Sequence, residues 1–227
     1  MSKDLWGRVA GTYDADHTLI SGPDLVRTVQ SELAATVQAG HVVELGCGTG
    51  LYTRAYAPHC TEVIAVDRSG RMVEFARWNL ASLPNVSVRL GDATATGLPS
   101  GSAEVVVAVN LLHVVPDASR VLTEILRLLH AGGVAVLVDF TTEKLPLGRV
   151  ALSVWRYLSR WGPMVGKGRQ EFTRASLEAL VQRMGFVTLR SRLIRGRAMN
   201  AAMVVAVKPE VQVDATARED VGERHPG

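Results

Sequence analysis

The segment Glu44-Leu45-Gly46-Cys47-Gly48-Thr49-Gly50 carries the strongest chemical signal in the chain. It follows a short apolar run, where glycines let the backbone approach a bound cofactor closely because they lack a Cβ atom. Its spacing differs from a dinucleotide fingerprint, whose third glycine would fall at Leu51. A carboxylate at Glu44 would repel a pyrophosphate and would suit the ammonium group of an amino-acid cofactor. The segment therefore favours a positively charged ligand over NAD.

Two aspartates close the next two valine-rich runs. Asp67 ends residues 62–67, and Asp92 follows residues 86–90 in Gly91-Asp92-Ala93. The first carboxylate is placed to accept hydrogen bonds from ribose hydroxyls, and the second could accept from the exocyclic amine of adenine. Either aspartate alone is more often a turn former. Three acidic strand ends in order indicate one ligand site, since open α/β sheets bind ligands at the carboxyl ends of their strands.

Strand-like and helix-like runs alternate and must position these residues. Strands are predicted at residues 41–45, 62–67, 86–90, 104–109, 134–140, 186–194 and 201–208, and helices at 69–83, 116–129, 146–161 and 176–184. Continuous valine-rich runs are typical of parallel strands buried on both faces. The short connection at residues 195–200 predicts that the last two strands pair antiparallel. We therefore expect a doubly wound, Rossmann-like α/β fold with a mostly parallel seven-stranded sheet, an antiparallel last strand and helices on both faces.

These motifs resemble those of class I S-adenosylmethionine-dependent methyltransferases, and within them the quinone-methyltransferase-like small-molecule branch, methyltransferase type 11. Residues 42–50 resemble the first motif of that family, residues 66–72 the second, residues 91–99 the third, and residues 9–14 the segment that closes over the cofactor. The resemblance implies S-adenosylmethionine as cofactor and S-adenosylhomocysteine as product. The cofactor contacts that we expect are Tyr13, Glu44, Gly46, Cys47, Gly48, Asp67, Arg68, Met72, Asp92, Ala93 and Asn110.

His113 and Asp139 are the candidate catalytic residues, because they follow the fourth and fifth strands at the edge where acceptors bind. His113 is either a general base or a packed histidine that orders its loop. Asp139 either serves the acceptor or caps the segment after it. The sequence alone shows no convincing base dyad, and a thiolate acceptor needs little help from a base. Cys47 is either a nucleophile or, more commonly, a small residue filling a tight turn.

An aromatic acceptor pocket is expected from His17, Trp155, Tyr157 and Trp161. We predict one domain over residues 1–208, with amino-terminal lid helices at 1–40, an acceptor-pocket lid insertion at 141–175 and a disordered tail at 209–227. The amphipathic helix in that insertion could instead be an ordinary surface helix or a peripheral membrane contact.

Composition restricts the class of protein and its acceptor. The net charge of +3, two cysteines and the lack of an apolar leader favour a cytoplasmic protein, either monomer or homodimer, without a metal site. We expect methyl transfer to a small, largely apolar molecule, with O, S, N or C as acceptor atom and a thiol or a phenol or quinone favoured, as in secondary metabolism.

The basic residues 149–197 leave an RNA methyltransferase as an alternative function. Residues 110–113 lack the Pro-Pro-aromatic signature that stacks a flipped base, so nucleic acid is disfavoured as a substrate. A non-methylating enzyme that uses the same cofactor, and a cofactor-binding regulator without activity, also stay open.

Overall fold

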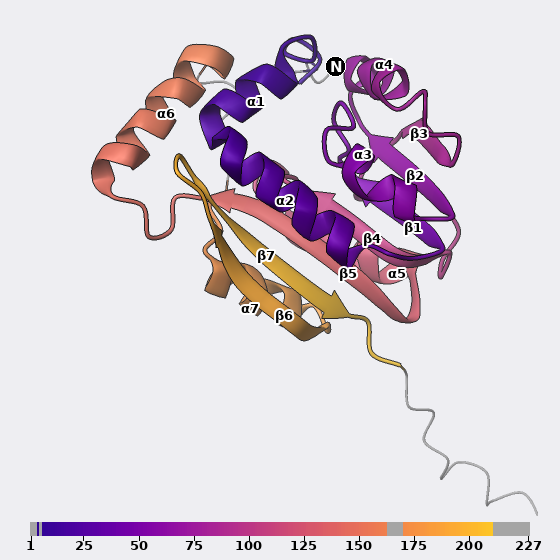
Figure 1. Cartoon of the computed structure of the whole chain (residues 1–227). Coiled ribbons are helices and arrows are strands. Elements are labelled where there is room, and N and C mark those ends of the chain that lie inside the picture. The colour runs from indigo at the N-terminus through magenta and orange to yellow at the C-terminus, as the bar shows by residue number, and fades with distance from the viewer. Residues whose placement is uncertain (1–3, 5, 163–169, 211–227) are drawn as a thin grey trace, which may run out of the picture.

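Seven strands form one sheet in the order β3-β2-β1-β4-β5-β7-β6 (Figure 1). The computed structural model describes residue 4 and residues 6–162 and 170–210. The strands are β1 (His41–Leu45), β2 (Glu62–Asp67), β3 (Val86–Leu90), β4 (Ala103–Val109), β5 (Leu129–Thr141), β6 (Val187–Arg195) and β7 (Asn200–Val207). The first five pair in parallel, and β7 runs antiparallel to both β5 and β6. The predicted fold class is therefore confirmed.

Helices cover both faces of this sheet. On one face lie α5 (Ala118–Leu128) and α7 (Arg174–Arg183), and on the other α2 (Pro23–Thr36), α3 (Thr53–Tyr56), the 3-10 turn η1 (Ala57–His59) and α4 (Gly70–Asn79). Successive valines of β4 alternate between the two cores: Val106 packs with α5, and Val105 and Val107 pack with α2. Both faces of the strand are buried, which explains the continuous valine-rich runs.

Capping residues set the helix starts. The Ser69 side chain accepts from the Met72 amide at 3.3 Å, and α4 begins directly after it. Thr173 caps α7, so this helix starts two residues before the predicted residue 176. The helix predicted at residues 116–129 is α5, which ends at Leu128, and β5 begins at Leu129 instead of at the predicted residue 134. Local cap chemistry thus decided boundaries that apolar periodicity placed only approximately.

Two helices stand at the edge of the fold, α1 (Tyr13–Ser21) and α6 (Leu147–Trp161) (Figure 1). They are held together by an ion pair between Arg160 and Asp16 with an N–O distance of 3.4 Å. Arg156 also donates to the carbonyl oxygen of Leu19 at 3.3 Å. Part of the predicted lid insertion, residues 163–169, and most of the predicted tail, residues 211–227, lie outside the described residues. Within the described residues, no helix has the length and apolar content needed to cross a membrane.

Candidate active site

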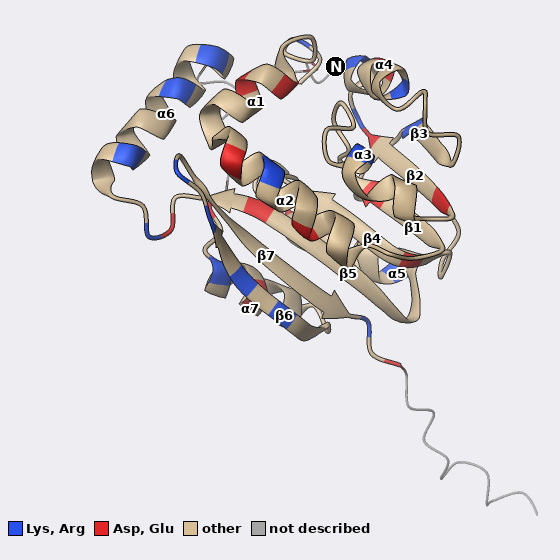
Figure 2. Cartoon of the chain, viewed as in Figure 1, with Lys and Arg blue, Asp and Glu red and all other residues tan. Residues whose placement is uncertain are grey.

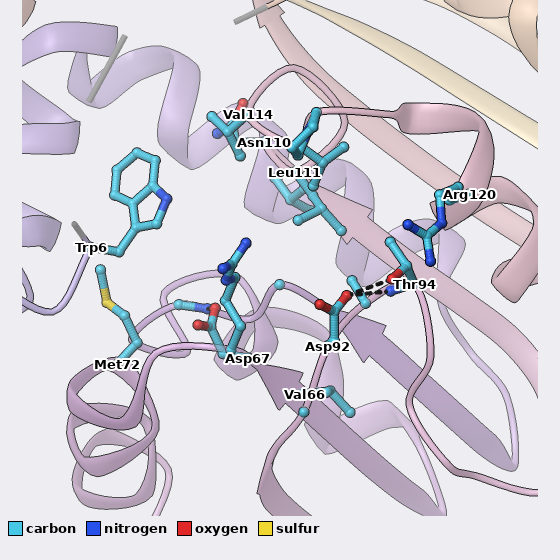
Figure 3. Close-up of a pocket in the computed structure, with 18 of the residues that line it drawn as sticks. Trp6, Val66, Asp67, Met72, Asp92, Thr94, Asn110, Leu111, Val114 and Arg120 are labelled. Atoms are coloured by element: carbon cyan, nitrogen blue, oxygen red, sulfur yellow. Dashed lines mark hydrogen bonds between the residues drawn. The ribbon is translucent and has the colours of Figure 1, made fainter. Parts of the chain in front are cut away.

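The carboxyl ends of the parallel strands surround a cavity of about 240 Å³, which we name the glycine-loop cavity. Nine of the eleven predicted cofactor contacts line it: Tyr13, Gly46, Gly48, Asp67, Arg68, Met72, Asp92, Ala93 and Asn110. Sequence reasoning missed other members of the wall, including Trp6, Thr94, Leu111, Val114 and Arg120. In Figure 3, Trp6 and Met72 lie at one end of the cavity and Thr94 and Arg120 at the other.

The glycine loop adopts a backbone that side chains disfavour. Gly46 has φ +72° and Gly48 has φ +54°. A Cβ atom on Gly46 would lie 2.8 Å from Cδ1 of Leu111, whereas one on Gly48 would meet only Tyr13, at 3.9 Å. The glycine at position 46 therefore permits close packing, and the one at 48 leaves space beside Tyr13 on the cavity wall.

Asp67 joins the end of β2 to the glycine loop. Its Oδ2 accepts from the Gly48 amide and its Oδ1 from the Ser69 amide, both at 2.9 Å. Burial raises the pKa of this carboxyl above its usual range, and the two amide donors oppose that rise. Each carboxylate oxygen retains a second acceptor site, so Asp67 can still bind hydroxyl groups of a ligand.

Asp92 occupies the end of β3. Its Oδ1 accepts from both the amide and the hydroxyl of Thr94 at 2.8 Å, as Figure 3 shows. These hydrogen bonds, first that of the Thr94 amide, lower the pKa of Asp92. The carboxylate is thereby fixed at the cavity wall and kept ionised, as an acceptor for an N–H group requires.

Two predicted cofactor contacts do not line the glycine-loop cavity. The carboxyl of Glu44 is buried against Tyr56, whose hydroxyl donates to Oε2 at 2.7 Å, and Thr53, whose hydroxyl donates at 2.5 Å. Burial raises the pKa of Glu44 to about 7. Glu44, which the sequence suggested as a partner for an ammonium group, therefore points into the core. Cys47 is also buried, and desolvation raises its pKa well above the usual value, which opposes the thiolate that a nucleophile requires.

A second cavity of about 470 Å³, which we name the aromatic cavity, adjoins the first. The two share Trp6, Tyr13 and Asn110 in their walls. Of the four predicted acceptor-pocket residues, His17, Tyr157 and Trp161 line the aromatic cavity. The fourth, Trp155, is 65% exposed and is not in its wall. Residues two apart on a helix do not share a face, so the helix that turns Tyr157 inward turns Trp155 outward.

Aromatic rings of α1 and α6 pack in parallel beside this cavity. Tyr13 stacks on His17 and on Trp161 with centroid distances of 5.5 Å in each case. The His17 Nε2 atom lies 2.8 Å from the hydroxyl of Tyr52. The pKa of His17 is lowered to about 3, mainly by burial and to a lesser extent by the nearby His113. His17 is therefore a neutral aromatic part of the wall at physiological pH.

His113 and Asp139 form a buried dyad. Nδ1 of His113 lies 2.5 Å from Oδ1 of Asp139, and His113 lines the aromatic cavity. A carboxylate can only accept, so Nδ1 carries the proton and Nε2 holds the free lone pair. The structure thus brings the two candidate catalytic residues into a contact that the sequence did not reveal. Asp139 does not line this cavity and reaches it only through its contact with His113.

Asn110 lies where the two cavities meet and has an unusual conformation. Its φ is +54°, and its Oδ1 accepts from the Phe140 amide at 3.0 Å. Its Nδ2 atom is buried without a hydrogen-bond partner among the described residues, as is Nε1 of Trp161. Buried donors left unpaired are uncommon in folded proteins. Both residues line the aromatic cavity, so a ligand there could accept hydrogen bonds from them.

The comparisons with known proteins agree with this site. Residues 43–137 match the family described as methyltransferase domain. The chain is 33% identical to a demethylmenaquinone methyltransferase of Clavibacter sepedonicus over 64% of this chain and 60% of that protein. It is 35% identical to a phosphatidylethanolamine N-methyltransferase of Cereibacter sphaeroides over 57% of this chain and 66% of that protein. Residues 43–137 are thus similar to the methyltransferase domain family, as the motifs in this part of the chain indicated.

The match to these two curated relatives spans less than two thirds of their length. The fold is shared over a wider range. A solved S-adenosylmethionine-dependent methyltransferase from Thermotoga maritima superposes with a TM-score of 0.69 and 21% identity, covering 90% of this chain and 98% of that one. This likeness supports the architecture alone.

Proposed function

We propose that this chain transfers a methyl group from S-adenosylmethionine to a hydroxyl group of a small, largely apolar aromatic molecule, of the phenol or quinol type. The observation that carries this proposal is the His113–Asp139 dyad in the wall of a cavity that adjoins the glycine-loop cavity. The proposed activity thus assigns one cavity to the cofactor and its neighbour to the acceptor.

The residues of the glycine-loop cavity fit S-adenosylmethionine. Asp67 would accept from the ribose hydroxyls, Asp92 from the adenine amine, and Met72 and Leu111 supply apolar surface for the ring. The unpaired Nδ2 of Asn110 would donate to the carboxylate of the methionine part. When bound, the cofactor supplies an electrophilic methyl group on a sulfonium.

The dyad supplies what a hydroxyl acceptor needs. Nε2 of His113 would take the proton of the acceptor hydroxyl as the methyl–sulfur bond of the sulfonium breaks and S-adenosylhomocysteine leaves as a neutral thioether. Asp139, which accepts from Nδ1, stabilises the imidazolium that results. The remaining work is positioning, because an in-line displacement depends on the alignment of acceptor and methyl group. A thiol acceptor would depend less on this base, because a thiolate forms more readily.

The aromatic cavity fits an apolar, planar acceptor. Rings from Trp6, Tyr13, His17, Phe140, Tyr157 and Trp161 contribute to its wall. Such side chains supply apolar contact area at low cost in conformational entropy. Two of the relatives are named for demethylmenaquinone and for phosphatidylethanolamine, and an apolar acceptor is consistent with both names.

A test compares methyl transfer by wild type and His113→Gln on a panel of phenols, naphthoquinols and aromatic thiols. We expect the variant to lower kcat on hydroxyl acceptors by about 10²–10⁴-fold, with S-adenosylmethionine affinity unchanged in calorimetry. The loss on thiols is expected to be smaller. His130→Gln, an exposed histidine outside both cavities, serves as control. Wild-type rates for His113→Gln on every hydroxyl acceptor would refute the role of the dyad.

A further inference from the structure

Large apolar side chains are exposed along one helix at the edge of the molecule. On α6, Leu147 is 87% exposed and Trp155 is 65% exposed. The other exposed members are Leu152, Val154 and Leu158 of α6, and Leu19 of the neighbouring α1. We name these six side chains the α6 face. Contiguous exposed apolar surface of this kind marks an interaction site more often than single apolar residues do.

The inward side of α6 is already used by the rest of the protein. Ser153 is buried and donates to the carbonyl oxygen of Ala198 at 3.1 Å, while Tyr157 and Trp161 line the aromatic cavity. Ordinary packing on the chain therefore explains only half of the helix. Figure 1 shows α6 at the periphery beyond α1, and the side chains of the α6 face are exposed there.

The charged residues of α6 are all basic. Residues 144–162 contain Lys144, Arg149, Arg156 and Arg160 and no aspartate or glutamate. Figure 2 shows α6 with basic positions and no acidic ones. Arg156 and Arg160 bind α1, whereas the side chain of Arg149 is exposed and has no hydrogen bond or ion pair to the described residues. Exposed apolar side chains on a helix whose own charged residues are all basic are the pattern of a helix that lies on an anionic lipid surface.

We propose that the α6 face docks on an anionic bilayer, with the helix lying in the interfacial plane. Val154 and Leu158 are each about half exposed and also line the aromatic cavity. The cavity wall is therefore continuous with the docking face. An apolar acceptor dissolved in the bilayer reaches the cavity along this wall, a step that rests on the proposed function, whereas the docking itself does not.

Co-sedimentation of the full chain with vesicles tests the docking. One set of vesicles contains phosphatidylcholine alone, and the other contains phosphatidylcholine with phosphatidylglycerol. We expect wild type to pellet mainly with the anionic vesicles, and less so at high salt. The double variant Leu147→Ser/Trp155→Ser should lose most of this binding, and Arg149→Glu should weaken it. Trp78→Ser is the matched control, because Trp78 is 78% exposed on α4, away from α6, and should pellet like wild type.

Three results would overturn the docking proposal. The first is no pelleting with either vesicle, and the second is equal pelleting of wild type and the double variant. The third is a dimer in light scattering that the double variant abolishes, since a second copy of the chain would then cover the α6 face. Methyl transfer to a water-soluble phenol, measured in parallel without vesicles, should be retained by the double variant. For wild type, methyl transfer without vesicle binding would overturn the docking alone, and vesicle binding without methyl transfer would overturn the proposed function alone.

Discussion

Nδ1 of His113 lies 2.5 Å from Oδ1 of Asp139, although 26 residues separate them in the chain. The contact joins the loop after β4 to the carboxyl end of β5, and both groups are buried. It fixes the imidazole with its Nε2 lone pair free, which is the tautomer that a general base requires.

Asp139→Asn tests that orientation. The amide of asparagine can donate to Nδ1, which favours the tautomer with the proton on Nε2 and removes the base. We expect kcat on a hydroxyl acceptor to fall by about 10²–10⁴-fold, while the KM for the acceptor changes little. Steady-state kinetics across pH, with circular dichroism to verify folding, measures both. A variant that keeps the wild-type pH profile and kcat would show that Asp139 is merely structural.

Asp67→Ala tests the cofactor cavity. Loss of its charge-assisted hydrogen bonds should weaken S-adenosylmethionine binding by about 1.5–3 kcal/mol, measured by isothermal titration calorimetry. Glu62→Ala at the exposed start of the same strand is the control. Because Asp67 also binds the amides of Gly48 and Ser69, the free energy of unfolding is measured as well. Unchanged affinity would remove Asp67 from the cofactor site.

The two tryptophans of α6 give a matched pair. Trp161 lines the aromatic cavity and Trp155 is exposed outside it. Trp161→Leu should raise the KM of an aromatic, water-soluble acceptor by about three- to tenfold, since ring–ring contacts contribute about 0.5–1.5 kcal/mol beyond buried area. Trp155→Leu should leave this KM unchanged. Equal effects from both variants would mean that the acceptor binds elsewhere.

The raised pKa of the buried Glu44 carboxyl should make the stability of the protein depend on pH. Its pKa is raised from 4.5 to about 7, chiefly by burial. Between these values the folded chain holds a proton that the unfolded chain has lost, so the free energy of unfolding decreases as pH rises through this range. The free energy of unfolding that is lost across this pH range is on the order of 3 kcal/mol, obtained by converting the pKa shift to a free energy. Glu44→Gln, compared with wild type in urea unfolding at several pH values, should remove this loss. Parallel pH profiles for the two proteins would contradict it.

The order of strands and helices could be predicted from the sequence, because buried parallel strands leave continuous valine-rich runs and glycine loops have fixed spacing. The same pattern located His113 and Asp139 at the correct sheet edge. It could not reveal their contact, because the approach of two side chains depends on the register of β4 against β5 and on the path of the loop between them.

Side-chain direction accounts for the other differences. Glu44 lies on β1, a strand whose positions are buried on both faces, so burial pattern alone did not say which way its carboxyl points. Tyr56 and Thr53, from the helix that follows the glycine loop, decide it. For Trp155 the signal was present, since its spacing of two from Tyr157 places the two rings on different faces of α6.

The fate of a labelled methyl group tests the proposed methyl transfer most directly. Wild type is incubated with trideuteromethyl S-adenosylmethionine and the acceptor panel, and the masses of the products are measured by mass spectrometry. We predict an acceptor that gains one trideuteromethyl group on oxygen, with this product strongly reduced in His113→Gln. An acceptor that is converted without gaining the label would contradict methyl transfer and indicate a non-methylating enzyme.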